Sequence, residues 1–118
     1  MITIGIVEDN DVLRSSMEML LQNNGNYQVV FSLHDARTIL EQTEIHMPRL
    51  ILMDIDMPGI NGIDAVKMVK KDFPAVDIIM FTVFEDDEKI FRSVMAGASG
   101  YLLKKIAPSR LLEALNDF

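Results

Sequence analysis

The stretch Leu50-Ile51-Leu52-Met53-Asp54-Ile55-Asp56-Met57-Pro58-Gly59 decides the fold. An unbroken apolar run, stopped by Pro and Gly, predicts a buried strand over residues 50–54. Strands buried on both faces are typical of parallel sheets covered by helices. Asp54 closes this run, and a carboxylate at the end of a buried strand costs free energy unless a counter-charge pairs with it. We therefore expect Asp54 to lie in a functional site.

A second apolar run ends in acidic residues in the same way. Ile2-Thr3-Ile4-Gly5-Ile6-Val7 is followed at once by Glu8-Asp9. Ligands of parallel α/β sheets bind outside the carboxyl ends of the strands. Two buried strands that both end in acids therefore predict one acidic pocket at one edge of a parallel sheet. A pocket of this kind suits a divalent cation and phosphoryl chemistry.

Strand-like and helix-like patterns alternate five times along the chain. This alternation predicts a doubly wound parallel (βα)5 sheet with helices on both faces. The length of 118 residues fits one domain, and we assign all of residues 1–118 to it. The expected strands cover residues 2–7, 27–33, 50–54, 77–82 and 99–103, and the expected helices cover residues 10–22, 35–42, 61–71, 86–96 and 108–117.

Composition excludes several classes of function. The chain has no Cys, which excludes disulfides, thiolate metal sites and cysteine nucleophiles. Its net charge of −7 is unfavourable for direct binding of nucleic acid by this segment. The apolar runs are far shorter than the roughly 20 residues of a membrane span. No signal peptide is visible, so we expect a cytoplasmic protein without membrane contact.

The polar residues that follow four of the strands have complementary chemistry. Clustered carboxylates repel one another, and Mg²⁺ relieves this repulsion because it prefers oxygen ligands. A lysine ammonium can pair with a phosphoryl oxygen, a threonine hydroxyl can donate a hydrogen bond to another, and an aspartate can act as a nucleophile. The residues expected at this edge are Glu8, Asp9, Asp54, Thr82 and Lys104.

Four segments together resemble the receiver domain of two-component response regulators. They are Val7-Glu8-Asp9-Asn10, Leu52 to Gly59, Phe81-Thr82, and Ala96-Gly97-Ala98-Ser99-Gly100-Tyr101-Leu102-Leu103-Lys104. The resemblance covers the whole chain and implies a flavodoxin-like fold with strand order 2-1-3-4-5. It is strongest to receivers that are coupled to a carboxy-terminal helix-turn-helix DNA-binding domain. That output domain is expected beyond residue 118.

The resemblance also implies a role for each site residue. Asp54 accepts a phosphoryl group from a phosphohistidine on a sensor histidine kinase, and Lys104 and Thr82 then bind its oxygens. Thr82 and Tyr101 act as the switch. Mg²⁺ or Mn²⁺ is held by Asp9 and Asp54, by Glu8 through water, and by the backbone carbonyl of Asp56. The domain is then no enzyme beyond its own phosphorylation and slow dephosphorylation.

Two positions depart from the commonest receiver pattern. Many receivers follow the lysine with a proline, whereas this chain continues Lys105-Ile106-Ala107-Pro108, so the loop is shaped in another way. Phe84 stands two residues after Thr82, where other receivers carry small or polar residues. We hypothesise that Phe84 shields the phosphoryl group from water. Signal output is expected through dimerisation, over the fourth helix, fifth strand and fifth helix, or over the first and fifth helices.

Two other functions remain open from the sequence. Phosphohydrolases of the haloacid-dehalogenase type also carry Asp-x-Asp after an apolar strand, as in Asp54-Ile55-Asp56. They place this motif near the amino terminus and need Thr or Val where this chain has Pro58. The second alternative is a receiver fold that serves as a constitutive interaction module, against which the complete set of site residues argues.

Overall fold

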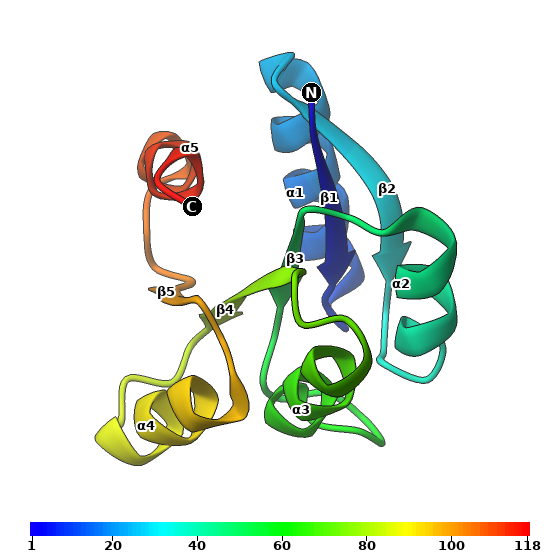
Figure 1. Ribbon diagram of the computed structural model, residues 1–118. Helices are drawn as coiled ribbons and strands as arrows, with labels where there is room; N and C mark the ends of the chain where they lie inside the picture. Colours follow the sequence, from blue (N-terminus) through cyan, green and yellow to red (C-terminus); the bar gives the residue numbers. More distant parts are fainter.

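The computed structural model describes residues 1–118, and it contains five strands and five helices in strict alternation (Figure 1). All strand pairs are parallel, and the strand order is β2-β1-β3-β4-β5. The predicted (βα)5 fold and strand order are therefore confirmed. The elements are β1 (Ile2–Val7), α1 (Asp11–Asn24), β2 (Tyr27–Leu33), α2 (Ile39–His46), β3 (Leu50–Met53), α3 (Gly62–Asp72), β4 (Asp77–Thr82), α4 (Asp87–Ala96), β5 (Gly100–Leu103) and α5 (Pro108–Asn116).

The central strand β3 explains why the deciding stretch is apolar without a break. Its side chains alternate between two separate hydrophobic clusters, one on each face of the sheet. Ile51 and Met53 belong to the cluster that α2 and α3 cover, and Leu50 and Leu52 belong to the cluster under α1 and α5 (Figure 1). A strand covered by helices on both faces has no position for a polar side chain before its end.

One predicted helix is displaced. The second helix was expected over residues 35–42, but α2 begins at Ile39 and ends at His46. Asp35 is the physical reason, because its side chain accepts hydrogen bonds from the backbone N–H of Arg37 at 3.0 Å and from Arg37 Nε at 2.9 Å. This local bonding holds the chain in a turn and delays the helix.

Two strand boundaries are also shorter than expected. The strand predicted over residues 50–54 ends at Met53, and the strand predicted to start at residue 99 starts at Gly100. At Asp54 the side chain accepts a hydrogen bond from the next backbone N–H, that of Ile55, at 2.8 Å. Asp54 therefore begins the loop that follows the strand, while its backbone N–H still donates to the Val7 carbonyl of β1 at 3.1 Å.

Side-chain caps start three helices at the carboxyl edge of the sheet. Asn10, Asn61 and Asp86 accept hydrogen bonds from the third backbone N–H of α1, α3 and α4 at 2.9–3.1 Å. Asn and Asp are favoured at this position because they satisfy amide groups that the helix leaves unpaired. The caps fix the loops that carry the polar residues of this edge.

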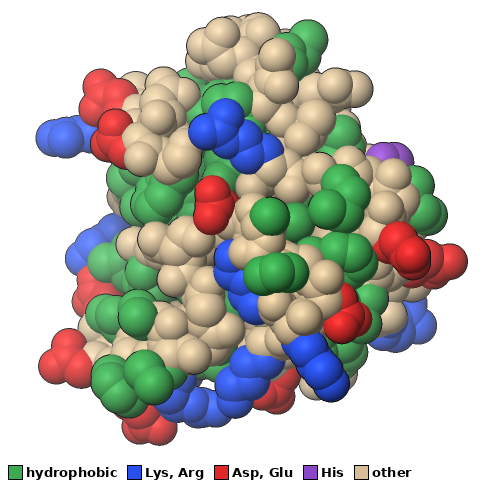
Figure 2. All heavy atoms as spheres, viewed as in Figure 1, with side chains coloured by type: hydrophobic (Ala, Val, Ile, Leu, Met, Phe, Trp, Pro, Cys, Tyr) green, Lys and Arg blue, Asp and Glu red, His purple; other side chains and the backbone are tan.

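Apolar side chains of α4 lie exposed on the surface of the domain. Phe91, Val94 and Met95 of α4 are all more than half exposed, and apolar side chains gather over α4 at the lower left of Figure 2. No helix has the length and apolar character needed to cross a bilayer.

Candidate functional site

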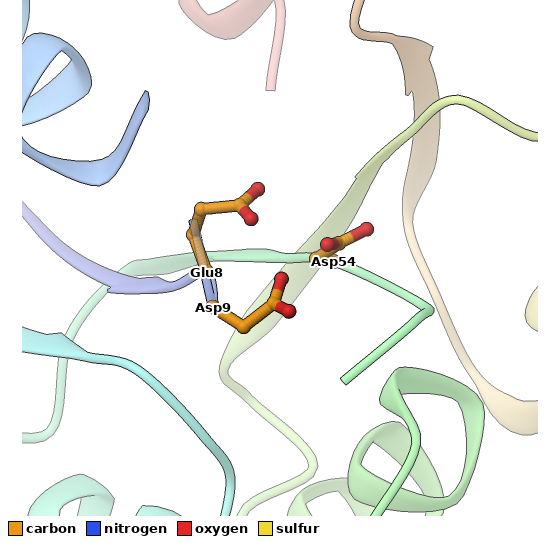
Figure 3. A group of neighbouring side chains, drawn as sticks. All are labelled: Glu8, Asp9 and Asp54. Carbon is orange, nitrogen blue, oxygen red and sulfur yellow. The ribbon is translucent and has the colours of Figure 1, made fainter. Parts of the chain in front are cut away.

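Strand register brings the predicted carboxylates together. Val7 of β1 and Met80 of β4 both pair with Met53 of β3, so the residues that follow these strands meet at one edge. Glu8, Asp9 and Asp54 each place a carboxylate oxygen within 4.8 Å of the others, and Figure 3 shows Glu8 and Asp9 reaching toward Asp54. Glu8 and Asp54 are buried, at 1% and 4% exposure, while Asp9 is exposed.

Lys104 supplies the counter-charge that the buried carboxylates require. Its Nζ lies 3.0 Å from Asp54 Oδ2 and 2.7 Å from Glu8 Oε1. The contact with Asp54 is a hydrogen bond, whereas the contact with Glu8 is an ion pair without hydrogen-bond geometry. One ammonium thus serves two buried carboxylates, and the charge of this group remains negative.

The burial of these charged groups shows in the acid–base properties of the site. Burial raises the pKa of Asp54 and of Glu8, although the contact of each carboxylate with the Lys104 ammonium opposes the rise. Burial lowers the pKa of Lys104, but its two carboxylate partners raise it further, so the net pKa lies above the ordinary value. Lys104 is therefore charged at neutral pH, and a further cation near the two acids would be favourable.

Backbone and side-chain donors hold the acids in place. Glu8 Oε2 accepts a hydrogen bond from the Asn10 backbone N–H at 3.0 Å. Arg14 Nη1 donates to the Glu8 backbone carbonyl at 2.8 Å, which draws the first turn of α1 against the site. The sequence prediction missed Arg14, because an arginine in the first half of a surface helix is ordinarily solvated and carries no local signal.

Gly62 is a second residue that the sequence prediction missed. A Cβ at this position would lie 1.8 Å from the backbone oxygen of Asp54, and the Gly62 N–H donates to Ile55 O at 2.8 Å. Only glycine allows α3 to begin directly against the backbone of Asp54. Asn61-Gly62 indicates a helix boundary in the sequence, but nothing local in it indicates this close approach.

Thr82 and Tyr101, the two predicted switch residues, both bond to the backbone of Phe84. Thr82 is fully buried at the end of β4, and its Oγ1 accepts a hydrogen bond from the Phe84 N–H at 3.3 Å. The Tyr101 hydroxyl donates to the Phe84 carbonyl at 2.8 Å, and its ring packs against the α2–α3 cluster. Both residues are therefore tied to the β4–α4 loop at Phe84. Their coupling during switching stays a prediction.

Asp56 and the loop after β5 complete the predicted site. The Asp56 side chain is exposed, and its backbone carbonyl accepts no hydrogen bond from the protein. The loop after β5 contains only trans peptide bonds, and a turn closes it through the bond from Ile106 N–H to Leu103 O at 3.0 Å. Lys105 pairs with Glu85, so the β4–α4 and β5–α5 loops are joined.

The donor set fits a hard divalent cation. Mg²⁺ takes one or two carboxylates and completes its coordination with water and phosphate oxygens. The exposed Asp9 and the buried Asp54 offer two such carboxylates. The Asp56 carbonyl has an unused lone pair, and Glu8 is already bound to Lys104 and Asn10. A role of Glu8 through water stays a prediction.

Comparison with known proteins identifies the family. The profile of the response regulator receiver domain matches residues 4–116, nearly the whole chain. The chain belongs to the response regulator receiver family. Receivers are signalling domains of two-component systems, so the predicted family and class of function are confirmed. The phosphohydrolase alternative is set aside, because the acidic Asp-x-Asp stretch follows the third strand of a receiver fold.

Three relatives illustrate the similarity. The chain is 33% identical to the transcriptional regulatory protein LnrK of Bacillus subtilis and 32% identical to the nitrate/nitrite response regulator NarL of Escherichia coli, each over 115 residues and 98% of this chain. The crystal structure of a LuxR-family two-component response regulator from Aurantimonas superposes with a TM-score of 0.92 and 28% identity, covering 98% of this chain and 82% of that one. The chain spans 52% and 53% of the length of LnrK and NarL, about half of each.

Proposed function

We propose that this receiver domain accepts a phosphoryl group on Asp54 from the phosphohistidine of a sensor histidine kinase. In this step an Asp54 oxygen forms a bond to phosphorus as the P–N bond to the histidine breaks, and the electron pair stays with the imidazole. The observation that carries the proposal is the position of Lys104, whose ammonium lies within 3.0 Å of both buried carboxylates at the open edge of the sheet. A lysine ammonium at this position can pair with a phosphoryl oxygen after transfer to Asp54.

Charge balance supports a requirement for Mg²⁺. Phosphorylation replaces the single charge of Asp54 with about −2, so the group with Glu8 and Asp9 then carries about −4 against +1 from Lys104. When bound, Mg²⁺ supplies the missing positive charge to the transferred phosphoryl group. We assign its ligands to Asp9, Asp54 and the Asp56 carbonyl, with Glu8 through water, and Mn²⁺ suits the same oxygen donors.

Thr82 is suited to read the phosphorylated state. Its Oγ1 accepts from the Phe84 N–H, so its own proton remains free to donate to a phosphoryl oxygen. A hydrogen bond to a charged group contributes about 1.5–3 kcal/mol, whereas shifting a two-state equilibrium from 1:99 to 99:1 takes about 5.5 kcal/mol. Thr82 alone is therefore insufficient, and Lys104 must contribute. Tyr101 transmits the shift, because it shares the Phe84 backbone with Thr82.

The output of this signal is proposed from the relatives. LnrK is named a transcriptional regulatory protein, and both it and NarL are about twice as long as this chain. We propose that the domain controls transcription in the cytoplasm, through a DNA-binding domain carried by the longer protein and through dimerisation. The exposed Phe91, Val94 and Met95 support α4 as one contact surface, since apolar side chains gain by losing contact with water.

Intact-mass spectrometry with a small phosphodonor and Mg²⁺ tests the proposal. The wild-type domain should gain about 80 Da, one phosphoryl group, and the Asp54→Asn variant should gain nothing. Asp72→Asn is the matched control, since Asp72 is exposed in the last turn of α3, outside the site, and the variant should still be labelled. A gain that survives Asp54→Asn would contradict the assignment. No gain in the wild type would instead support a constitutive interaction module.

A further inference from the structure

A small cavity borders the phosphoacceptor site on the side of α4. Its volume is about 190 Å³, and its polar lining comes from Asp56, Asn61, Lys89 and Arg92, with the ring of Phe84 as an apolar wall. Asp56 follows the phosphoacceptor by two residues, and Phe84 follows Thr82 by two residues. The cavity therefore touches the two loops that flank the acceptor carboxylate.

Positive charge dominates this cavity although the protein as a whole carries −7. Lys89 Nζ lies 4.6 Å from the centre of the Phe84 ring, and its only ion pair is a long one of 3.8 Å to Asp86. Arg92 is exposed and makes no hydrogen bond or ion pair. Two cations thus face a single lining carboxylate, that of Asp56. An unpaired guanidinium beside a lysine attracts small anions to this cavity.

We propose that this cavity receives the carboxylate leaving group when a small acyl phosphate donates its phosphoryl group to Asp54. The inference rests on the proposed function of Asp54. An Asp54 oxygen forms a bond to phosphorus, the bond between phosphorus and the acyl oxygen breaks, and the electron pair leaves with that oxygen as a carboxylate. No proton is transferred. Lys89 and Arg92 stabilise the negative charge that develops on this oxygen in the transition state.

A donor with a different leaving group separates this role from general attraction. Phosphoramidate transfers the same phosphoryl group, but its nitrogen leaves as neutral ammonia and is protonated beforehand. Cations in the cavity therefore cannot favour its departure. If Lys89 and Arg92 merely attract the phosphoryl group, their loss slows both donors, phosphoramidate less because its protonated nitrogen lowers its net negative charge, whereas stabilisation of the leaving group affects only the acyl phosphate.

The experiment measures rates of phosphorylation by acetyl phosphate and by phosphoramidate, with Mg²⁺ at fixed ionic strength. The test variant is Lys89→Met with Arg92→Gln, and the matched control is Lys67→Met with Lys71→Gln, two exposed lysines of α3 that do not line the cavity. In the test variant the acetyl phosphate rate should fall about tenfold, as expected for the loss of two charges near the developing anion, while the phosphoramidate rate changes less than about twofold. The control should change both rates less than about twofold.

The possible outcomes distinguish the leaving-group role of the cavity from the proposed phosphorylation of Asp54. Slowing of both donors by more than about twofold in a folded variant, or no slowing with either, would overturn the leaving-group role while leaving Asp54 as the acceptor. No phosphorylation of the wild type by either donor would overturn the proposed function itself. Far-UV circular dichroism and the denaturant midpoint of the test variant are compared with those of the wild type, because a misfolded variant would also lose activity with both donors.

Discussion

Replacing Asp54 by asparagine should stabilise this domain when no divalent cation is present. The substitution removes one of two buried carboxylates that share a single ammonium. Lys104 is then left with one buried partner, Glu8, and the pair is neutral. Asparagine keeps an oxygen that can accept from the Ile55 N–H, so the local hydrogen bond of Asp54 is retained.

Opposing terms determine the size of the effect. At an effective dielectric of about 20, the attraction between Lys104 and Asp54 at 3.0 Å is about 5.5 kcal/mol. Repulsion from Glu8 within 4.8 Å is at least about 3.5 kcal/mol, and the exposed Asp9 adds about 1 kcal/mol after screening by water. The attraction to Lys104 and the repulsion from the two acids nearly cancel, and burying the Asp54 charge costs several kcal/mol more. We expect Asp54→Asn to raise the free energy of unfolding by about 1–3 kcal/mol, in agreement with the raised pKa of Asp54.

Denaturant unfolding in EDTA at pH 7 measures this free energy. Asp72→Asn in the last turn of α3 is the matched control, because Asp72 is exposed and forms no ion pair, so its replacement should change stability by less than about 0.5 kcal/mol. Adding Mg²⁺ should stabilise the wild type by about 1.4 kcal/mol at ten times its dissociation constant, and Asp54→Asn should gain less. An Asp54→Asn domain that is less stable than wild type in EDTA by more than about 1 kcal/mol would refute the reasoning, since the lysine pair would then outweigh burial.

Four further changes test other parts of the structure. Lys104→Met should destabilise the metal-free domain by about 3–5 kcal/mol, as judged by denaturant unfolding, because two buried carboxylates lose their only cation; an unchanged midpoint would show that they are neutral or hydrated. Gly62→Ala should cost at least about 1–3 kcal/mol and slow phosphorylation of Asp54, since its Cβ would lie 1.8 Å from a backbone oxygen; equal stability would mean that α3 shifts freely. Because the pKa values of Glu8 and Asp54 are higher in the folded than in the unfolded state, both groups contribute stability that depends on pH. This contribution is fully present below the unfolded pKa of about 4, and it is lost as pH rises through the folded pKa. In EDTA, the unfolding free energy of wild type minus that of Asp54→Asn should therefore fall between pH 4 and 7, and a rise would reverse the sign of the argument. Phe84→Ala should speed dephosphorylation several-fold if the ring excludes water, as followed by loss of the phosphoryl mass, and an unchanged rate would exclude the shielding role.

Most of the fold follows from local patterns. The run Leu50-Ile51-Leu52-Met53 predicts a central strand because both of its faces are buried, and the structure places its side chains alternately in two clusters. The start of the second helix was predicted four residues too early. The turn closed by Asp35 competes with the helix, because the apolar pattern of this segment suits a turn as well as a helix.

The candidate site, like the fold, was predicted only in part from the sequence. The sequence predicts which carboxylates, hydroxyl and ammonium follow the strands, since parallel strands bring their carboxyl ends to one edge. It does not predict that Lys104 pairs with Glu8 as closely as with Asp54, because that depends on side-chain packing between residues far apart in the chain. The contact of Gly62 with the Asp54 backbone is equally invisible in local patterns.

The sequence by itself determined the alternation of elements, the family and the acidic edge, because each depends on residue type and short-range spacing. Only the tertiary structure decided which charges are buried, which cation serves them, and that Lys89 and Arg92 face a cavity beside Asp56. The physical reason is that burial and Coulomb energy depend on distances across the fold, and residues such as Asp54 and Lys104 acquire those distances only when β3 and β5 are held in one sheet.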